Sequence, residues 1–347
     1  MKRHQTVVML LTCTLLAGGG CRVMSEGHPA AEATYVGFAL DGYPITEERL
    51  HGLAGPQGQR PDMVMFYLQW PSPANLAGSD FPTESVEAIH DAGSMPCITW
   101  EPMYIEGGEE KTIQASVVTN GTYDAYIRTF ARQAADWGKP VLVRFAHEMN
   151  ISRYHWGTSE ADYGPDSPRL YTALFRYVVE LCRDAGNTNI LWVFCPNAES
   201  VPAPSQEDAT TWNRMLSYYP GDAYVDVLGV DGYNWGLSRN TKEHGWTSRP
   251  KTFRDIFEKP VRELTIVAPQ KPVIVFETAS VGDTSEKSEW LRKAFNASAD
   301  LDIHGIIWFQ VDKETYWTLP VEVLYGLKKS TAAQGRNIHQ WIKGIQK

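Results

Sequence analysis

Eight short apolar segments recur along the chain, and they constrain its fold more than any other feature of the sequence. Each is rich in Val, Ile, Phe and Tyr and is nearly continuous rather than alternating, as expected for parallel strands covered on both faces. The segments are Tyr35–Asp41, Met63–Trp70, Met95–Glu101, Val141–Glu148, Asn189–Pro196, Val225–Tyr233, Pro272–Thr278 and Ile303–Gln310. Apolar residues spaced by three and four predict amphipathic helices between several of them, at Tyr123–Trp137, Leu170–Ala185, Phe253–Val267 and Ser285–Ala297.

Strands that alternate with helices in this way predict an α/β protein with a single (β/α)₈ barrel. A chain of 347 residues is within the usual range for one such barrel, and its 43% hydrophobic residues suffice for a large core. The alternative is an open doubly wound sheet, which should carry a glycine-rich turn after its first strand. The segment Leu40–Pro44 has no such turn, so the closed barrel is favoured.

The first 20 residues have the pattern of a secretory signal peptide. A basic start at Lys2 and Arg3 precedes a short apolar run, and small residues follow it up to Cys21. Cys21 after small residues resembles the acylated cysteine of bacterial lipoproteins, which predicts lipidation there. Residues 21–33 would then form a tether, and residues 34–347 the (β/α)₈ domain. We therefore expect an exported protein, either anchored to the cell envelope by a lipid or secreted, that meets the membrane only through this anchor.

Composition narrows the class of ligand. The formal net charge of −9 argues against a nucleic-acid surface, because phosphate binding needs clustered Lys and Arg. A neutral ligand suits such a chain better. The 12 Trp and 16 Tyr fill the core, line a sugar-binding cleft, or both, and composition does not separate these roles. The remaining cysteines are Cys97, Cys182 and Cys195, and they fit no zinc or redox motif. We expect them to be small buried hydrophobic residues, and a single disulfide between two of them is the alternative.

Two glutamates stand at the ends of the fourth and seventh predicted strands, Glu148 and Glu277. Active sites of (β/α)₈ barrels form at the C-terminal ends of the strands, where side chains from opposite sides converge. Hydrolysis of a glycosidic bond with retention needs one carboxyl as acid/base and a second as nucleophile. The pair therefore predicts this chemistry, which requires no metal or other cofactor. A zinc protease motif is not expected, because Ile151 occupies the position of its second histidine.

Three segments resemble glycoside hydrolase family 26, a family of β-mannanases and mixed-linkage β-glucanases on a (β/α)₈ barrel. They are Arg144–Asn150, Tyr219–Trp235 and the segment from Pro272 through Glu277 to Ala279. The resemblance implies Glu148 as acid/base and Glu277 as nucleophile, and it extends over roughly Tyr35 to Trp308.

The same resemblance implies roles for the residues around the two glutamates. His147 would contact the substrate or position the acid/base, Tyr233 would hydrogen-bond the nucleophile, and Trp308 would form a platform beneath the sugar. Trp156 matches a tryptophan of the family that follows the acid/base. From the residues themselves, the positive charge of Arg144 would keep Glu277 ionised.

Other strand-end residues are candidates for contacts with the substrate. Trp100 and Glu101 end the third predicted strand, where Glu101 is well placed to touch sugar hydroxyls. Trp70 and Trp235 are either cleft platforms or packing residues.

The leading functional hypothesis is a retaining endo-β-glycanase, a monomer acting on β-1,4-mannan or a related hemicellulose. The segment from Thr99 to Pro102 instead resembles the mixed-linkage β-1,3-1,4-glucanases of the family, and a non-catalytic surface glycan-binding protein is the alternative of another class. Processing of the cell's own exopolysaccharide would use the same chemistry.

Overall fold

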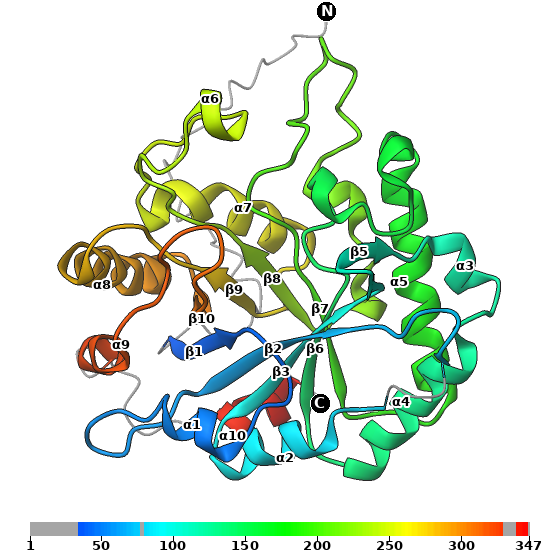
Figure 1. Cartoon of the computed structure of the whole chain (residues 1–347), viewed down its shortest axis with the longest axis horizontal. Helices are drawn as coiled ribbons and strands as arrows, with labels where there is room; N and C mark the ends of the chain where they lie inside the picture. The colour runs from blue at the N-terminus through cyan, green and yellow to red at the C-terminus, as the bar shows by residue number, and fades with distance from the viewer. Residues whose placement is uncertain (1–33, 77–79, 329–337, 346–347) are drawn as a thin grey trace, which may run out of the picture.

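The computed structural model describes residues 34–76, 80–328 and 338–345. Its centre is a closed parallel barrel with the strand order β1-β10-β9-β8-β7-β6-β3-β2 (Figure 1). The barrel strands are β1 (Tyr35–Leu40), β2 (Met63–Gln69), β3 (Met95–Glu101), β6 (Val141–Phe145), β7 (Ile190–Phe194), β8 (Val227–Asp231), β9 (Val273–Thr278) and β10 (Ile303–Phe309). The predicted (β/α)₈ barrel is confirmed, and each strand lies within or close to its predicted segment.

Helices surround the barrel, and the long ones cover the outer faces of its strands (Figure 1). They are α1 (Glu47–His51), α2 (Thr83–Asp91), α3 (Ala115–Thr119), α4 (Asp124–Trp137), α5 (Ser167–Asp184), α6 (Thr241–His244), α7 (Phe253–Val267), α8 (Thr284–Asp300), α9 (Val321–Lys328) and α10 (Ile338–Ile345). Short 3₁₀ segments lie at Ser152–Tyr154, Glu160–Asp162, Met215–Tyr218 and Asp222–Tyr224, the last two in place of an α-helix between β7 and β8.

Local sequence explains where the long helices begin and end. Thr252 and Asp283 open α7 and α8 with reciprocal hydrogen bonds to the third residue of each helix, which satisfies otherwise unpaired N–H groups. Gly138 closes α4 in the left-handed conformation that glycine adopts without strain. The four helices predicted from apolar spacing are α4, α5, α7 and α8, so those predictions are confirmed.

The barrel strands are buried on both faces, as their continuous apolar character predicts. Every residue of β1, β3, β6, β7, β8, β9 and β10 is buried, and only the last three residues of β2 are partly exposed. Side chains that point inward along such strands reach solvent only beyond the strand ends. The C-terminal end of the barrel is therefore the place where polar groups can gather.

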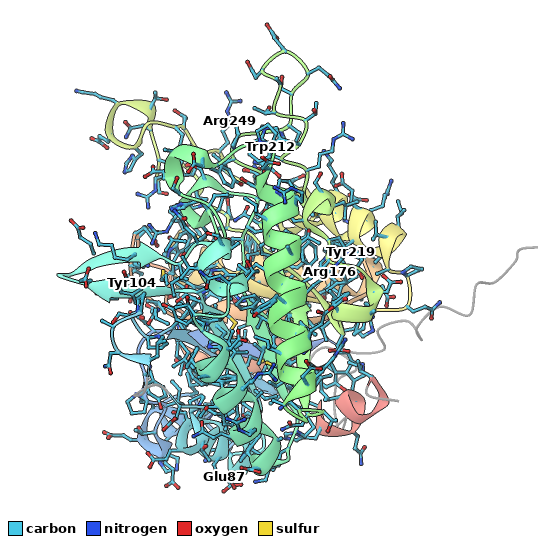
Figure 2. All side chains as sticks on the ribbon, turned by 90° about the vertical axis from the view of Figure 1, so that its right-hand side faces the viewer. Glu87, Tyr104, Arg176, Trp212, Tyr219 and Arg249 are labelled. Carbon is cyan, nitrogen blue, oxygen red and sulfur yellow. The ribbon has the colours of Figure 1, made fainter. Side chains whose placement is uncertain are left out.

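A small antiparallel hairpin, β4 (Met103–Glu106) and β5 (Glu109–Thr112), follows β3 and was not predicted. Its two-residue turn is Gly107-Gly108, both at positive φ, as two-residue hairpin turns require. Figure 2 shows the hairpin, marked by Tyr104, projecting from the body of the protein.

The fourth barrel strand ends three residues earlier than predicted. β6 stops at Phe145 because Ala146 takes a positive φ of 47°, which breaks the extended conformation, and Glu148 does the same at 50°. The two glutamates therefore lie in different backbone structures: Glu277 is within β9, whereas Glu148 is on a tightly turned loop.

Cys97, Cys182 and Cys195 are buried and free, which confirms their expected role as small hydrophobes. The predicted signal peptide, the lipidation site Cys21 and the tether lie outside the described residues. Within the described part of the chain, no helix has the length and apolar character needed to cross a membrane.

Candidate active site

A cavity of about 270 Å³ opens at the C-terminal ends of the barrel strands. Glu148 and Glu277 both line it, together with Tyr67, Glu101, Asn197 and Tyr233. The convergence of the two predicted carboxyls at this end is therefore present in the structure, and their surroundings differ sharply.

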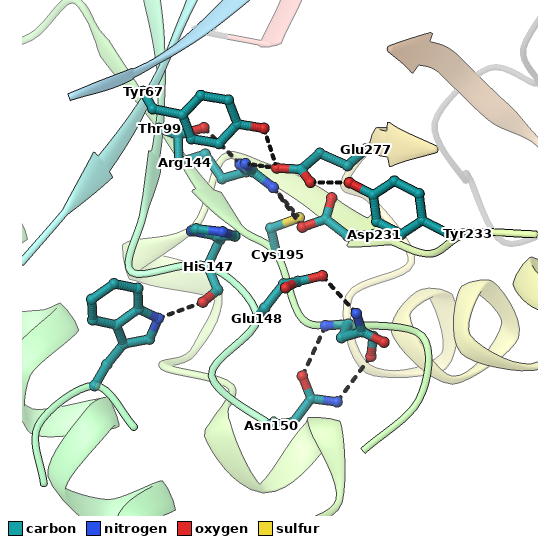
Figure 3. Close-up of polar contacts among 12 residues, drawn as sticks. Tyr67, Thr99, Arg144, His147, Glu148, Asn150, Cys195, Asp231, Tyr233 and Glu277 are labelled. Atoms are coloured by element: carbon teal, nitrogen blue, oxygen red, sulfur yellow. Dashed lines mark hydrogen bonds and ion pairs between the residues drawn. The ribbon is translucent and has the colours of Figure 1, made fainter. Parts of the chain in front are cut away.

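Glu277 is held by three hydrogen-bond donors (Figure 3). Its Oε1 accepts from the Arg144 guanidinium and, at 2.6 Å, from the hydroxyl of Tyr67, whereas its Oε2 accepts from the hydroxyl of Tyr233. Burial and the nearby charge of Glu277 raise the pKa of both tyrosines well above their usual range, so both remain donors. A guanidinium and two hydroxyls are an environment suited to a carboxylate anion.

Arg144 is fully buried beneath the cavity and connects its own strand to three others. From β6 it forms ion pairs with Asp231 at the end of β8 and Glu277 in β9, and its Nε donates to the Thr99 hydroxyl of β3 at 3.0 Å. Burial lowers the pKa of Arg144, but the two carboxylates outweigh burial and hold that pKa well above its usual value. The guanidinium is therefore a permanent positive charge under the nucleophile candidate.

Glu148 has a poorer environment for a negative charge. Its carboxyl accepts one hydrogen bond, from the Asn197 amide at 2.6 Å. Burial, and after it the charge of Glu277, raise the pKa of Glu148 from 4.5 to about 7. At neutral pH this carboxyl is thus protonated in a large fraction of molecules, as a general acid must be.

The backbone around Glu148 is held in a strained shape. Ala146 and Glu148 both have positive φ, which costs a residue other than glycine roughly 1–2 kcal/mol. The Glu148 N–H donates to the Cys195 carbonyl at 2.8 Å, which fixes this loop against the end of β7. The two turns direct Glu148 into the cavity while the residue between them, His147, points elsewhere.

Asn150 positions Asn197, the residue that donates a hydrogen bond to Glu148 (Figure 3). Its side-chain Oδ1 accepts from the Asn197 N–H at 2.8 Å, and its Nδ2 donates to the Asn197 carbonyl at 2.9 Å. The oxygen and the nitrogen of the Asn150 side-chain amide therefore both bond to the backbone of Asn197. The Asn197 side chain is left to face Glu148.

A third carboxyl, Glu101, also lines the cavity. It accepts from the Gln69 amide at 2.6 Å, and burial raises its pKa from 4.5 to about 7 although this hydrogen bond opposes the shift. At the rim above it, Glu110 of the hairpin pairs with Arg153 at 3.1 Å. Glu101 therefore faces the cavity, and its contact with sugar hydroxyls stays a prediction.

Two predicted substrate contacts are wrong because the strands alternate sides. In β3, Glu101 faces the cavity, so Trp100 points outward and stacks on Phe130 of α4 at 4.2 Å. In β10, Phe309 faces the cavity, so Trp308 points outward toward Trp290 of α8. Both tryptophans are fully buried and belong to the packing between barrel and helices.

His147 and Trp156 are also buried and lie outside the cavity lining. The His147 ring packs against Tyr154 at 4.7 Å, and the Trp156 indole N–H donates to the His147 carbonyl. Burial, with the charge of Arg144 next, holds the pKa of His147 well below its usual value, so the ring is neutral. The structure therefore does not support direct substrate contacts, and it leaves the other expected role, positioning of the acid/base loop.

Several cavity residues were not predicted. Tyr67 and Gln69 lie two apart in β2 and so share one face, a signal that was present but hidden inside an apolar segment. Asn197 follows β7, and Trp317 comes from the loop after β10, where the sequence carries no recognisable pattern. The sequence allowed either a cleft or a packing role for Trp235 and Trp70. Trp235 lines the cavity, whereas Trp70 packs in the core.

Among the described residues, no group of three or more His, Cys, Asp and Glu side chains could hold a metal ion.

Comparisons with known proteins point to one family of enzymes. The profile of Glycosyl hydrolase family 26 matches residues 109–253, a segment that includes Glu148 and Tyr233. Endoglucanase H of Acetivibrio thermocellus is 31% identical over 267 residues, which is 76% of this chain and 26% of that protein. A mannan endo-1,4-beta-mannosidase of Bacillus subtilis is 30% identical over 129 residues, 36% of this chain and 32% of that protein.

The solved structure of a Bacillus subtilis mannanase superposes with a TM-score of 0.60 at 18% identity over 85% of each chain, a likeness of fold. The chain thus spans about a quarter to a third of these two sequence relatives. The protein belongs to glycosyl hydrolase family 26.

Proposed function

We propose that the protein is a retaining endo-β-glycanase in which Glu277 is the nucleophile and Glu148 the acid/base. The observation that carries the proposal is the contrast between the two carboxyls in one cavity. Glu277 accepts from a permanent cation and two hydroxyls, whereas Glu148 has one neutral donor and a pKa of about 7. Environments that separate two neighbouring carboxyls in this way assign the base and the acid.

In the first step the Glu277 carboxylate bonds to the anomeric carbon as the bond from that carbon to the leaving oxygen breaks. Glu148 gives its proton to that oxygen, so the departing chain leaves as an alcohol. Arg144 and the two tyrosines hold the Glu277 carboxyl group in its orientation before this attack.

In the second step a water oxygen bonds to the anomeric carbon, Glu148 takes the water's proton, and the ester bond to Glu277 breaks. The same residue can now act as base because the esterified Glu277 no longer carries a charge. The charge of Glu277 is one of the two influences that raise the pKa of Glu148, so its loss lowers that pKa between the steps.

For the substrate, β-1,4-mannan or a related hemicellulose is the first proposal, supported by the similarity to mannan endo-1,4-beta-mannosidases. Mixed-linkage β-glucan is the second, and one observation favours it. The match to Endoglucanase H covers 76% of this chain, whereas the match to the Bacillus subtilis mannosidase covers 36%. A cavity walled by Tyr233, Trp235 and Trp317 suits the flat faces of either neutral sugar chain.

Activity on mannan, lichenan and xylan, measured side by side, decides the substrate. Proton NMR of the first product formed decides the stereochemistry, and we expect retention of the β-configuration. Glu277→Ala should abolish hydrolysis while leaving the fold intact. Unchanged activity of Glu277→Ala would refute the mechanism, and tight glycan binding without hydrolysis by the wild type would favour the non-catalytic alternative.

We also propose that the protein is exported and anchored by a lipid on Cys21, as the pattern of residues 1–21 suggests. Labelling of cells with a radioactive fatty acid tests this proposal. Wild type should incorporate the label, and Cys21→Ser should not; label retained by Cys21→Ser would contradict lipidation at this residue.

A further inference from the structure

A second cavity, of about 280 Å³, lies beside the catalytic one. The two share Asn197, Tyr233 and Trp235 in their walls, so they are direct neighbours. The remaining wall comes chiefly from the loop between β8 and α7, which includes Trp246 and Arg249. This loop and its short helix α6 lie at the periphery of the barrel, beyond the end of β8 (Figure 1).

Trp246 gives this cavity an aromatic wall. Its side chain is 45% exposed, and among the described residues no other tryptophan is as exposed. It stands nearly perpendicular to Trp235, with ring centroids 5.6 Å apart, and the Arg239 guanidinium covers the Trp235 ring at 4.4 Å. Trp235 is thus covered by its neighbours, whereas much of the Trp246 ring is open to solvent and accessible to a ligand.

The loop that carries Trp246 is held in place by hydrogen bonds. Ser248 and Arg239 bond to each other twice: the Arg239 N–H donates to the Ser248 hydroxyl at 3.1 Å, and the Ser248 N–H donates to the Arg239 carbonyl at 3.2 Å. The Asn234 side-chain oxygen accepts from the Lys251 N–H at 2.9 Å, which closes the base of the loop. A rigid aromatic ring binds a ligand with little loss of conformational entropy.

The same loop is tied to the catalytic cavity. Arg239 donates to the Glu314 carbonyl at 3.1 Å, and Glu314 and Trp317 line the catalytic cavity from the loop after β10. The loop that carries Trp246 is therefore bonded to one wall of the catalytic cavity. Polar groups at the second cavity include Arg249, at the outer edge of the molecule in Figure 2, and the ion pair of Lys251 with Glu199.

We propose that the second cavity is a distal sugar-binding subsite, in which Trp246 stacks on a pyranose ring of the same β-glycan chain whose scissile bond lies between Glu148 and Glu277. The inference rests on the proposed function and deepens it. One chain of neutral sugars fits an aromatic platform with a few hydroxyl-binding polar groups directly beside the catalytic cavity. Such a subsite makes longer chains better substrates and favours cleavage within them.

The test is the dependence of kcat/KM on chain length, measured with oligosaccharides of two to six sugars from whichever β-glycan the wild type cleaves. Stacking of one aromatic ring contributes up to about tenfold in affinity. For Trp246→Ala we therefore expect the ratio of kcat/KM between the longest and shortest substrates to fall about tenfold. Trp246→Phe, which keeps a flat ring, should recover most of that ratio.

Tyr316→Ala is the matched control, because Tyr316 is an exposed aromatic that lines neither cavity. Its length ratio should equal that of the wild type. If Trp246→Ala cleaves every length as the wild type does, the subsite assignment is wrong and the proposed function stands. If the wild type cleaves no β-glycan, the proposed function fails; calorimetric titration of hexasaccharide into wild type and Trp246→Ala then judges the subsite alone, and equal affinities overturn it.

Discussion

The candidate acid/base depends on a single donor, and that donor can be removed without touching either carboxyl. The Asn197 amide donates to Glu148 at 2.6 Å, and its hydrogen bond lowers the pKa of Glu148 against the opposing effects of burial and Glu277. Asn197 is itself fixed by Asn150. The ionisation of Glu148 is therefore adjustable through a residue that does no chemistry of its own.

Asn197→Ala should raise the pKa of Glu148 above about 7, because the charged form loses its hydrogen bond. The first step requires protonated Glu148, so the alkaline limb of the pH–activity profile should move up by about 0.5–1 pH unit. The measurement is kcat/KM from pH 4 to pH 10. Asn120→Ala, an exposed asparagine after α3, serves as control. An alkaline limb that stays in place or moves down would contradict the assignment of Glu148.

The two tyrosines on Glu277 should contribute unequally. Tyr67 shares Oε1 with Arg144, which remains after Tyr67→Phe, whereas Tyr233 donates to Oε2. A hydrogen bond to a charged group contributes about 1.5–3 kcal/mol. We expect kcat/KM to fall about tenfold for Tyr67→Phe and about a hundredfold for Tyr233→Phe. Steady-state kinetics of both variants provide the check, and a larger loss for Tyr67→Phe would reverse this ranking.

At the scale of elements, the barrel was predictable because its signals are long and redundant. Eight strands carry continuous apolar segments and four helices carry apolar residues spaced by three and four, so an error of one or two residues at an end does not hide the element. The hairpin of β4 and β5 was missed because four-residue strands of charged and exposed residues, such as Glu109–Thr112, lack such a pattern. The Gly107-Gly108 pair was its one local signal.

The site was only partly predictable because it depends on which face of a strand each residue takes. Glu277, Tyr233 and Arg144 lie together as expected, but Trp100 and Trp308 are each one position away from a residue that faces the cavity. A shift of one residue exchanges the two faces of a strand, and continuous apolar strands give no alternation from which to read the face. Contacts between loops distant in sequence, such as Asn197 with Glu148, leave no local signal at all.

Arg144 links β6 to β8 and β9 through a fully buried charge, which makes it an element of stability as well as of the site. Arg144→Met should lower the free energy of unfolding by about 3–5 kcal/mol, since it leaves Asp231 and Glu277 buried beside each other without a cation. The triple variant Arg144→Met, Asp231→Asn and Glu277→Gln removes those charges and should recover most of the loss. Urea unfolding at pH 7 measures both. A triple variant as unstable as the single one would show that packing, not charge, determines the cost.

At the scale of the whole molecule, the catalytic end of the barrel lowers stability as the pH rises. Glu101 and Glu148 each have a pKa of about 7 in the folded protein against an ordinary value of 4.5. Between these values the folded state binds more protons than the unfolded state, so the free energy of unfolding decreases as the pH rises. The stabilising contribution of the protonated carboxyls is complete below about pH 4.5 and is lost as the pH passes about 7.

Glu101→Gln isolates one of these contributions, because a neutral amide can still accept from Gln69 without ever bearing a charge. The variant should match the wild type in stability near pH 4 and exceed it at pH 8 by roughly 1–3 kcal/mol, an amount that follows from the shift in pKa. Urea unfolding at the two pH values measures the difference, with Glu106→Gln, exposed on the hairpin, as the matched control. A difference that is the same at both pH values would mean that Glu101 has the same pKa in the folded and unfolded protein. Burial at this end of the barrel would then not disfavour the ionised carboxylate. If the difference grows with pH as expected, the cavity trades stability above neutral pH for carboxyls that are protonated where the first step needs a proton.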